Sequence, residues 1–204
     1  MTNHLATAFS SGSLARVLPA IILIAAVIYA YRAFRKHVFP DNFGIVENGM
    51  IYRSGQLYPS QVEKLIAQHC IRSIVHGHLP ELSARDESRF KKVCAQNDVR
   101  MIPIIMPGDG LGDFAQFDEA LEILQDPGNL PALVCCARGT HRTGAIIAAY
   151  RVLVQGWPAS DALDEMERYR FRPRPHRYKG GEHPLVPHLK EYFRLRARGS
   201  ERDG

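Results

Sequence analysis

Cys136 and Arg142 are separated by five residues and lie between two apolar runs of the chain. The five residues are Ala137, Arg138, Gly139, Thr140 and His141. A loop of this kind between a strand and a helix can direct its backbone N–H groups at an anion bound at the helix N-terminus. Such surroundings lower a thiol pKa from about 8.5 to roughly 3.5–7.5. The pattern predicts that residues 136–142, here called the cradle, bind phosphate above a nucleophilic Cys136 thiolate.

Arg142 has the side chain that a phosphate site needs. Its planar guanidinium can hold two phosphoryl oxygens at once, which a lysine cannot do. Backbone N–H groups of residues 137–142 would complete the grip, while the side chains of Arg138 and His141 would point outward to the rest of the substrate. The Cys136 thiolate, Arg142 and the backbone N–H groups together predict phosphoryl transfer to Cys136, followed by hydrolysis of the cysteinyl phosphate. The alternative is that Cys135 and Cys136 are inert hydrophobic residues at a strand end.

Two motifs resemble one known family. The run from Cys136 to Gly144 resembles the signature of the cysteine-dependent tyrosine and dual-specificity phosphatases, in which His-Cys is followed by five residues, Arg, and Ser or Thr. Its Arg-Gly-x-His-Arg-Thr-Gly part looks most like the atypical dual-specificity branch of plants and fungi and like related bacterial proteins. Residues 42–55, the opening segment, are similar to the start of that branch. The resemblance covers about residues 42–170 and implies a phosphatase that needs no metal or organic cofactor.

The resemblance also implies roles for three further positions. Thr143 would place its hydroxyl near the sulfur and ease departure of the thiolate. The general acid would be an aspartate in the loop at residues 107–113, where Asp109 is the first choice and Asp113 is expected to cap the next helix. Some atypical members could manage without this acid. Cys135 stands where the family has histidine, which leaves open how far the Cys136 pKa falls and whether Cys135 is a resolving thiol.

The apolar patterns predict elements that would position the cradle. Phe43 to Arg53 reads as a hairpin with its turn at residues 47–49, and later strands and helices alternate. Strands are expected at residues 71–75, 101–106 and 132–135, and helices at 60–68, 83–97, 114–124, 145–154 and 160–169. This alternation predicts an α/β fold with a parallel-rich sheet flanked by helices. Ligands of such sheets bind at the carboxyl ends of the strands, where the cradle falls. His76 and His78 would approach the same edge, either touching substrate or lying in solvent.

The first 42 residues predict a membrane anchor ahead of the phosphatase domain. Residues 14–36 contain an apolar stretch of about 31 Å as a helix, close to one hydrocarbon core, which predicts a single-pass transmembrane helix. A signal peptide is the alternative. Arg32, Arg35 and Lys36 follow the stretch, so the domain would face the cytoplasm at the cell membrane. We expect a disordered tail at 1–13, a linker at 37–42, the phosphatase domain at 43–198 and a tail at 199–204.

Charge and cysteine usage exclude other classes. The net charge of +5 divides into +4 for residues 1–36, −6 for 37–167 and +7 for 168–204, which does not suggest a nucleic-acid partner. Six basic residues lie between residues 168 and 179 and form either a solvated tail or a site for anionic lipid or polyphosphorylated substrate. These are Arg168, Arg170, Arg172, Arg174, Arg177 and Lys179. The cysteines Cys70, Cys94, Cys135 and Cys136 lack zinc-ligand spacing, so no metal is expected.

The predicted substrate is a phosphate monoester, and the pattern allows several carriers. Phosphotyrosine proteins come first, and inositol phosphates or phosphoinositides come second because the plant and fungal branch includes enzymes acting on inositol pyrophosphates. A different class also stays open, since loss of the usual histidine could leave an inactive module that only binds a phosphorylated partner. Turnover distinguishes the two. The oligomeric state is left undetermined.

Overall fold

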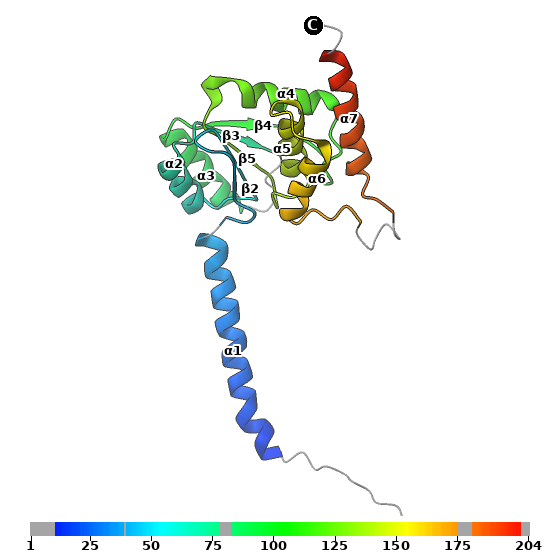
Figure 1. Cartoon of the computed structure of the whole chain (residues 1–204). Helices are drawn as coiled ribbons and strands as arrows, with labels where there is room; N and C mark the ends of the chain where they lie inside the picture. Colours follow the sequence, from blue (N-terminus) through cyan, green and yellow to red (C-terminus); the bar gives the residue numbers. More distant parts are fainter. Residues whose placement is uncertain (1–10, 39, 78–82, 175–180, 201–204) are drawn as a thin grey trace, which may run out of the picture. The chain divides into compact units, whose positions relative to one another are not determined.

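The structure is a computed structural model that describes residues 11–38, 40–77, 83–174 and 181–200. The chain divides into two compact units, residues 1–39 and residues 40–204 (Figure 1). The cradle and all five strands belong to the second unit.

The smaller unit contains the helix α1, Ser11–Val38. Its side chains are described for residues 17–31, all of them exposed. Within the described parts of the chain, no helix is long and apolar enough to cross a membrane. The prediction of a transmembrane anchor at residues 14–36, and with it of a single-pass location at the cell membrane, is therefore wrong.

The second unit is built on a five-stranded sheet with the order β1-β2-β5-β3-β4. β1 and β2 form the predicted antiparallel hairpin, and the pairs β2–β5, β5–β3 and β3–β4 are all parallel. The sheet is thus parallel-rich, as expected. In register, Ser54 and His76 flank Cys135, so three strands end side by side at the cradle. The strands are β1 Gly44–Glu47, β2 Ile51–Ser54, β3 Ser73–His76, β4 Arg100–Pro103 and β5 Ala132–Cys135.

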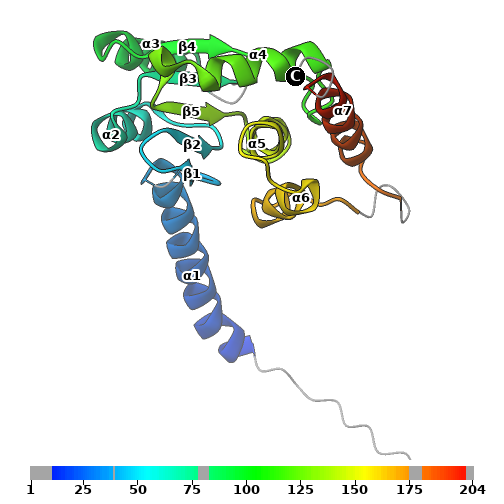
Figure 2. The ribbon, with the colours of Figure 1, turned by 45° about the horizontal axis from the view of Figure 1, so that its top comes forward.

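Helices cover both faces of this sheet, which Figure 2 shows with α2 and α3 on one side and α5, α6 and α7 on the other. Each face has its own apolar core. Tyr52, Ile74 and Leu133 pack under α2 and α3, whereas Ile51, Val75 and Val134 pack under α4 to α7. The helices are α2 Pro59–His69, α3 Ala84–Gln96, α4 Phe114–Gln125, α5 Arg142–Leu153, α6 Ala159–Arg168 and α7 Leu185–Ser200, with a 3₁₀ turn at Pro127–Asn129.

The helix α5 follows the cradle and lies in the middle of the larger core. Residues 142–151 are all buried. Ala145, Ala148 and Ala149 let the sheet and α6 approach closely, since small side chains permit short distances between elements. The helix begins at Arg142, three residues earlier than the apolar pattern predicted. Arg142 and Thr143 therefore lie in its first turn, next to the carboxyl end of β5.

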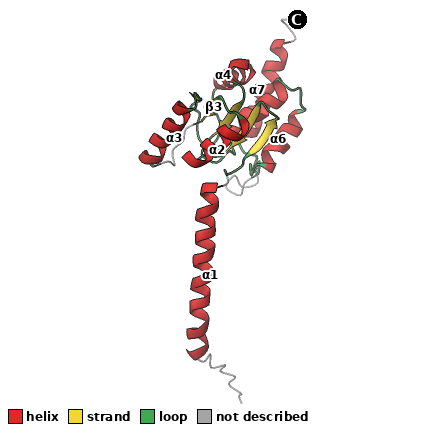
Figure 3. Cartoon of the chain, turned by 90° about the vertical axis from the view of Figure 1, so that its left-hand side faces the viewer, coloured by secondary structure: helices red, strands yellow, loops and turns green. Residues whose placement is uncertain are grey.

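The helix α7 was not predicted from the pattern. Leu185, Leu189, Tyr192 and Phe193 are buried against the core, whereas Lys190 and the arginines of the helix are exposed. High basic content in residues 168–204 concealed this one-sided apolar spacing. Figure 3 shows the strands of the second unit among helices that include this one. Arg177 and Lys179 of the predicted basic segment lie outside the described residues.

Candidate active site

The cradle connects β5 to α5. Cys136 follows the last residue of β5, and Arg142 opens α5. Gly139 between them has a φ of +64°, and a Cβ at this position would lie 2.6 Å from the backbone nitrogen of Gly55. A residue with a side chain would be strained in this conformation and would clash, so glycine permits the loop to turn tightly against the end of β2.

A hollow of about 250 Å³ lies at the cradle. Two of the predicted phosphate-binding residues, Gly139 and Thr140, are buried and contact the opening segment instead of lining the hollow. Among the described residues that line the hollow, none is acidic, and the size and charge suit a phosphate group. The lining consists of Gly108, Cys136, Ala137, Arg138, His141 and Arg142.

The Cys136 thiol is buried at the floor of the hollow. Burial raises the pKa of this thiol, but neighbouring donors lower it by more, so that the net shift is downward. The donors, in order of effect, are the hydroxyl and the N–H of Thr143, the N–H of Arg138 and the Arg142 guanidinium. The N-terminus of α5 adds positive potential at the same place. The thiolate is therefore stabilised even though Cys135 replaces the usual histidine.

Arg142 is 7% exposed and is held beside Cys136 by the segment after β3. Its Nη1 donates to the carbonyl oxygen of Gly77 at 3.4 Å. A Cβ on Gly77 would lie 3.1 Å from the Arg142 Cδ and 3.5 Å from the Cys136 Cβ. The lack of a side chain at Gly77 leaves room for the guanidinium next to the thiol.

The loop with the predicted general acid packs against the outside of the cradle. Gly110, with φ +86°, lies so close to the His141 backbone that a Cβ would be 3.2 Å from its carbonyl carbon. A carboxylate oxygen of Asp109 accepts from the Leu111 N–H at 3.1 Å, while the preceding Gly108 lines the hollow. Asp113 is the N-cap of α4, where its N–H donates to Gln116 Oε1 at 2.9 Å, as predicted. The residues on both sides of Asp109 thus contact the cradle or line the hollow, whereas Asp109 itself is not among the described lining residues.

Cys135 and Cys136 are neighbours in sequence but belong to different surroundings. Cys135 is 1% exposed in the core under α2 and α3, and burial raises the pKa of its thiol. Cys136 lines the hollow. His76, at the end of β3, pairs in register with Cys135, and His78 lies outside the described residues. The resolving role of Cys135 stays a prediction.

The cradle is held by hydrogen bonds from residues for which the sequence predicted no role. The Asn42 side chain donates to the Arg138 carbonyl oxygen at 2.8 Å and to the Tyr169 carbonyl oxygen at 3.3 Å. Arg53 Nη2 donates to the Gly139 carbonyl oxygen at 2.8 Å. Asn42 and Arg53 belong to the opening segment, whose resemblance to the family could have pointed to them. No sequence motif pointed to Tyr169.

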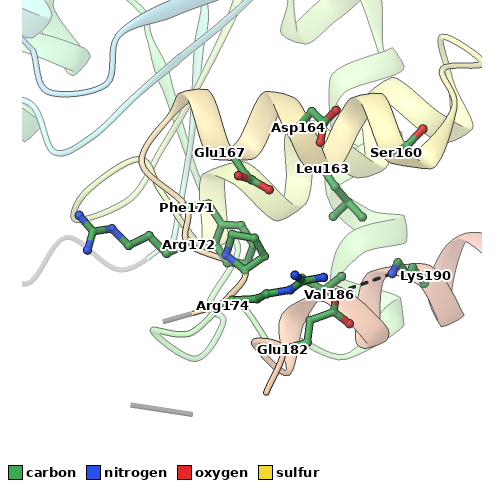
Figure 4. A pocket seen from close by; sticks show the side chains of 11 residues that line it. Ser160, Leu163, Asp164, Glu167, Phe171, Arg172, Arg174, Glu182, Val186 and Lys190 are labelled. Carbon is green, nitrogen blue, oxygen red and sulfur yellow. Dashed lines mark ion pairs between the residues drawn. The ribbon is translucent and has the colours of Figure 1, made fainter. Parts of the chain in front are cut away.

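A second, larger hollow lies between α6 and α7. This groove of about 710 Å³ has an apolar floor of Leu163, Phe171 and Val186. Figure 4 shows acidic and basic side chains around this floor, with Glu182 and Lys190 joined as an ion pair at 3.8 Å. Phe171 also packs edge-on against His141 of the cradle, with ring centroids 5.6 Å apart. The rim is formed by Ser160, Asp164, Glu167, Arg172, Pro173, Arg174, Glu182 and Lys190.

In the part of the chain that the structure describes, no group of three or more His, Cys, Asp or Glu residues is arranged to hold a metal ion.

Comparison with known proteins places these features in a family. Residues 37–178 match the Tyrosine phosphatase family. Inositol diphosphatase SIW14 of Saccharomyces cerevisiae is 45% identical over 137 residues, which cover 65% of this chain and 46% of the yeast protein. Inositol diphosphatase DSP3 of Arabidopsis thaliana is 33% identical over 139 residues, covering 63% and 62%. The chain thus spans about half to three fifths of the length of these two relatives.

A solved structure supports the fold. The core catalytic domain of the PP-IP phosphatase SIW14 from S. cerevisiae superposes with a TM-score of 0.63 at 24% identity, covering 81% of this chain and 96% of that domain. The cradle with its cysteine and arginine, the sheet order and the family match agree with one another. The chain belongs to the tyrosine phosphatase family, whose members are cysteine-based phosphoric monoester hydrolases.

Proposed function

We propose that this chain hydrolyses phosphate groups through Cys136 and that its substrates are small polyphosphates of the inositol diphosphate class. The observation that supports the chemistry best is the buried Cys136 thiol, whose pKa is lowered inside a hollow that also contains the Arg142 guanidinium. A thiolate is the nucleophilic form of cysteine, and a guanidinium beside it can bind the phosphoryl oxygens. Both requirements of the first step meet in one small site.

In the first step, the Cys136 sulfur attacks phosphorus opposite the leaving oxygen. The S–P bond forms as the P–O bond breaks, and the phosphoryl oxygens are bound by Arg142 and the cradle N–H groups. The Asp109 carboxylic acid gives its proton to the leaving oxygen. The products of this step are the dephosphorylated molecule and a cysteinyl phosphate.

In the second step, water attacks the phosphorus of the cysteinyl phosphate. The Asp109 carboxylate takes a proton from that water, the P–S bond breaks, and inorganic phosphate is released. The electron pair returns to sulfur, where the Thr143 hydroxyl stabilises the thiolate by a hydrogen bond. The same hydroxyl helps to lower the Cys136 pKa in the resting site, so the interaction that favours the thiolate there would also favour its departure from phosphorus.

The substrate class follows from the charge at the mouth of the hollow. Arg138 is exposed at the rim, and the described lining contains Arg142 as a second cation and no acidic side chain. None of the described lining residues is a phenylalanine, tyrosine or tryptophan that could stack on a phenol ring. A compact molecule with several phosphates suits this surface better than one phosphorylated tyrosine. The named activities of the yeast and plant relatives support the same class.

Phosphotyrosine in proteins is the second candidate, supported by the description of the matched family. The proposal therefore reverses the order of preference that the sequence alone suggested. The two candidates differ in the ring and in the number of negative charges, so a substrate panel separates them.

The test is phosphate release by the purified full-length chain under reducing conditions. The panel contains p-nitrophenyl phosphate, a phosphotyrosine peptide and a diphosphoinositol polyphosphate. We expect kcat/KM for the diphosphoinositol substrate to exceed that for the peptide by at least about tenfold, a difference of about 1.4 kcal/mol in transition-state binding. The Cys136→Ser variant should release no phosphate from any of them, because a serine hydroxyl is not ionised here.

The matched control is Cys135→Ala, which changes the neighbouring cysteine in the other core. It should keep kcat/KM within about threefold of the wild-type value. Absence of release from every substrate would overturn the assignment as a phosphatase. A higher kcat/KM for the peptide would overturn the substrate class and leave the chemistry of Cys136 standing.

A further inference from the structure

Arg53 is a buried cation directly behind the cradle. It is the third residue of β2 and has 0% of its surface exposed. Its Nη2 donates to the Gly139 carbonyl oxygen at 2.8 Å, and its guanidinium carbon lies 3.6 Å from the centre of the Tyr169 ring. Arginine is almost never fully buried unless it is paired with an acid. The full burial of Arg53 therefore needs an explanation.

The chain offers a direct contrast in a second buried arginine. Arg151 forms a bidentate pair with Glu165, with Nε–Oε2 at 3.0 Å and Nη2–Oε1 at 2.8 Å. Arg53 has no such pair: within the described residues its Nε and Nη1 make no hydrogen bond. Leaving a buried charge without an ionic partner is costly. An anion bound in the cradle would supply the missing opposite charge.

Arg53 remains charged in spite of this burial. Burial lowers its pKa to about 10, against the opposing influence of Tyr169, Glu165 and Cys136. At neutral pH the side chain is thus protonated. It adds a second positive charge to that of Arg142 on the protein side of the cradle.

The neighbouring glycines and Tyr169 fix where Arg53 lies. A Cβ on Gly144, in the first turn of α5, would be 4.0 Å from Arg53 Nη2, so the guanidinium lies under both the loop and the helix start. On the other side, a Cβ on Gly44 would be 2.0 Å from the Tyr169 hydroxyl, which shows how closely that ring is pressed on β1. The guanidinium is held between this ring and the Gly139 carbonyl.

We propose that Arg53 is a positioning residue of the active site, which turns the Gly139 carbonyl away from the hollow and stabilises the anions that the cradle holds. With that carbonyl bonded behind the loop, the loop cannot turn it toward the phosphate. The N–H groups of the cradle then face the hollow. The proposal rests on the proposed function for the reaction that it serves, but it can be measured without turnover.

The test measures two properties of the full-length chain with Arg53→Met. The first is binding of tungstate, an oxyanion that mimics phosphate, by calorimetry. The second is the pH dependence of iodoacetamide alkylation at Cys136, located by tandem mass spectrometry. We expect the dissociation constant for tungstate to rise about tenfold or more. We expect the alkylation profile to move to higher pH by about one unit, because one unit corresponds to a tenfold change in ionisation.

The matched control is Arg151→Lys, which weakens the other buried arginine site without touching the cradle. It should lower the melting temperature and leave tungstate binding and the alkylation profile unchanged. If Arg53→Met changes both properties no more than this control does, the proposal is wrong. A wild-type chain that releases no phosphate would refute the proposed function, yet these two measurements would still decide the role of Arg53.

Arg53→Lys is the second variant, needed if Arg53→Met does not fold. Its ammonium keeps the charge, so the alkylation profile should return close to that of the wild type. Tungstate binding should still be weaker by at least about threefold, because an ammonium cannot stack on Tyr169 and bond Gly139 as a planar guanidinium does. Wild-type binding by this variant would overturn the proposed role in anion binding of the hydrogen bond from Arg53 to the Gly139 carbonyl.

Discussion

The cradle hollow and the α6–α7 groove differ in both size and chemistry. The groove, at about 710 Å³, is nearly three times as large as the hollow of about 250 Å³. Its rim carries three acidic and three basic residues over an apolar floor, whereas the described lining of the cradle hollow has two arginines and no acid. A large apolar pocket is usually the first candidate for a site. In this chain the smaller hollow is the better candidate for the active site, because it brings two arginines next to the Cys136 thiol.

The two hollows are also held in different ways. The cradle is fixed by hydrogen bonds from the opening segment, from residues 86 and 96 positions away in the chain. The described ion pair of the groove joins Glu182 and Lys190, which are exposed and lie eight positions apart. We therefore expect substitutions at the cradle to change catalysis and equivalent substitutions at the groove to change little.

The largest expected difference in kcat/KM is between two separate Arg→Lys variants, one in the cradle hollow and one on the groove rim. Arg142→Lys should lower kcat/KM by about 10²–10³, because lysine loses the bidentate hold on the phosphoryl oxygens in the transition state. Arg174→Lys, on the groove rim, should leave kcat/KM within about twofold of the wild type. Steady-state kinetics on the best substrate provides the measurement. A comparable loss in both variants would mean that the groove takes part in substrate binding.

An intermediate effect is expected from Asp109→Asn. It should lower kcat/KM for a phenyl phosphate by about 10–10², since kcat/KM reports the step that forms the cysteinyl phosphate and proton donation to a poor leaving group is worth that much or more. For p-nitrophenyl phosphate, whose leaving group needs little protonation, the loss should stay below about threefold. Asp113→Asn is the matched control, because asparagine caps a helix as well as aspartate does, and activity should not change. Equal losses on both substrates would argue against Asp109 as the acid.

The smallest effect is expected from the groove ion pair. Lys190→Ala should change the free energy of unfolding by less than about 1 kcal/mol, because both partners are exposed and screened by solvent. Activity should be unaltered. A double-mutant cycle with Glu182→Gln, read by chemical denaturation, isolates the pair. A coupling clearly above 1 kcal/mol would show that the groove is more rigid than this comparison assumes.

The cradle was predictable because its parts are contiguous. The features that predict a phosphate site there are a thiol, a glycine turn, an arginine, backbone N–H groups and one helix end, and all of these are local. Alternating strands and helices likewise predicted the parallel-rich sheet and the place of the cradle at its carboxyl edge. The role of Asp113 as a helix cap was also readable, since capping depends on residues within one turn.

Other features depended on tertiary contacts. Neither the burial of Arg53 behind Gly139 nor the position of Tyr169 against it follows from local spacing, because these residues meet only when β2, the cradle and the end of α6 pack together. The helix α7 was concealed by its exposed arginines, although its buried face covers the core. The composition of the apolar stretch in α1 predicted a membrane span, but among the described residues no helix is long and apolar enough to form one. Sequence alone determined the chemistry of the cradle, since neighbouring residues supply it, whereas the packing of distant segments decided what supports the cradle.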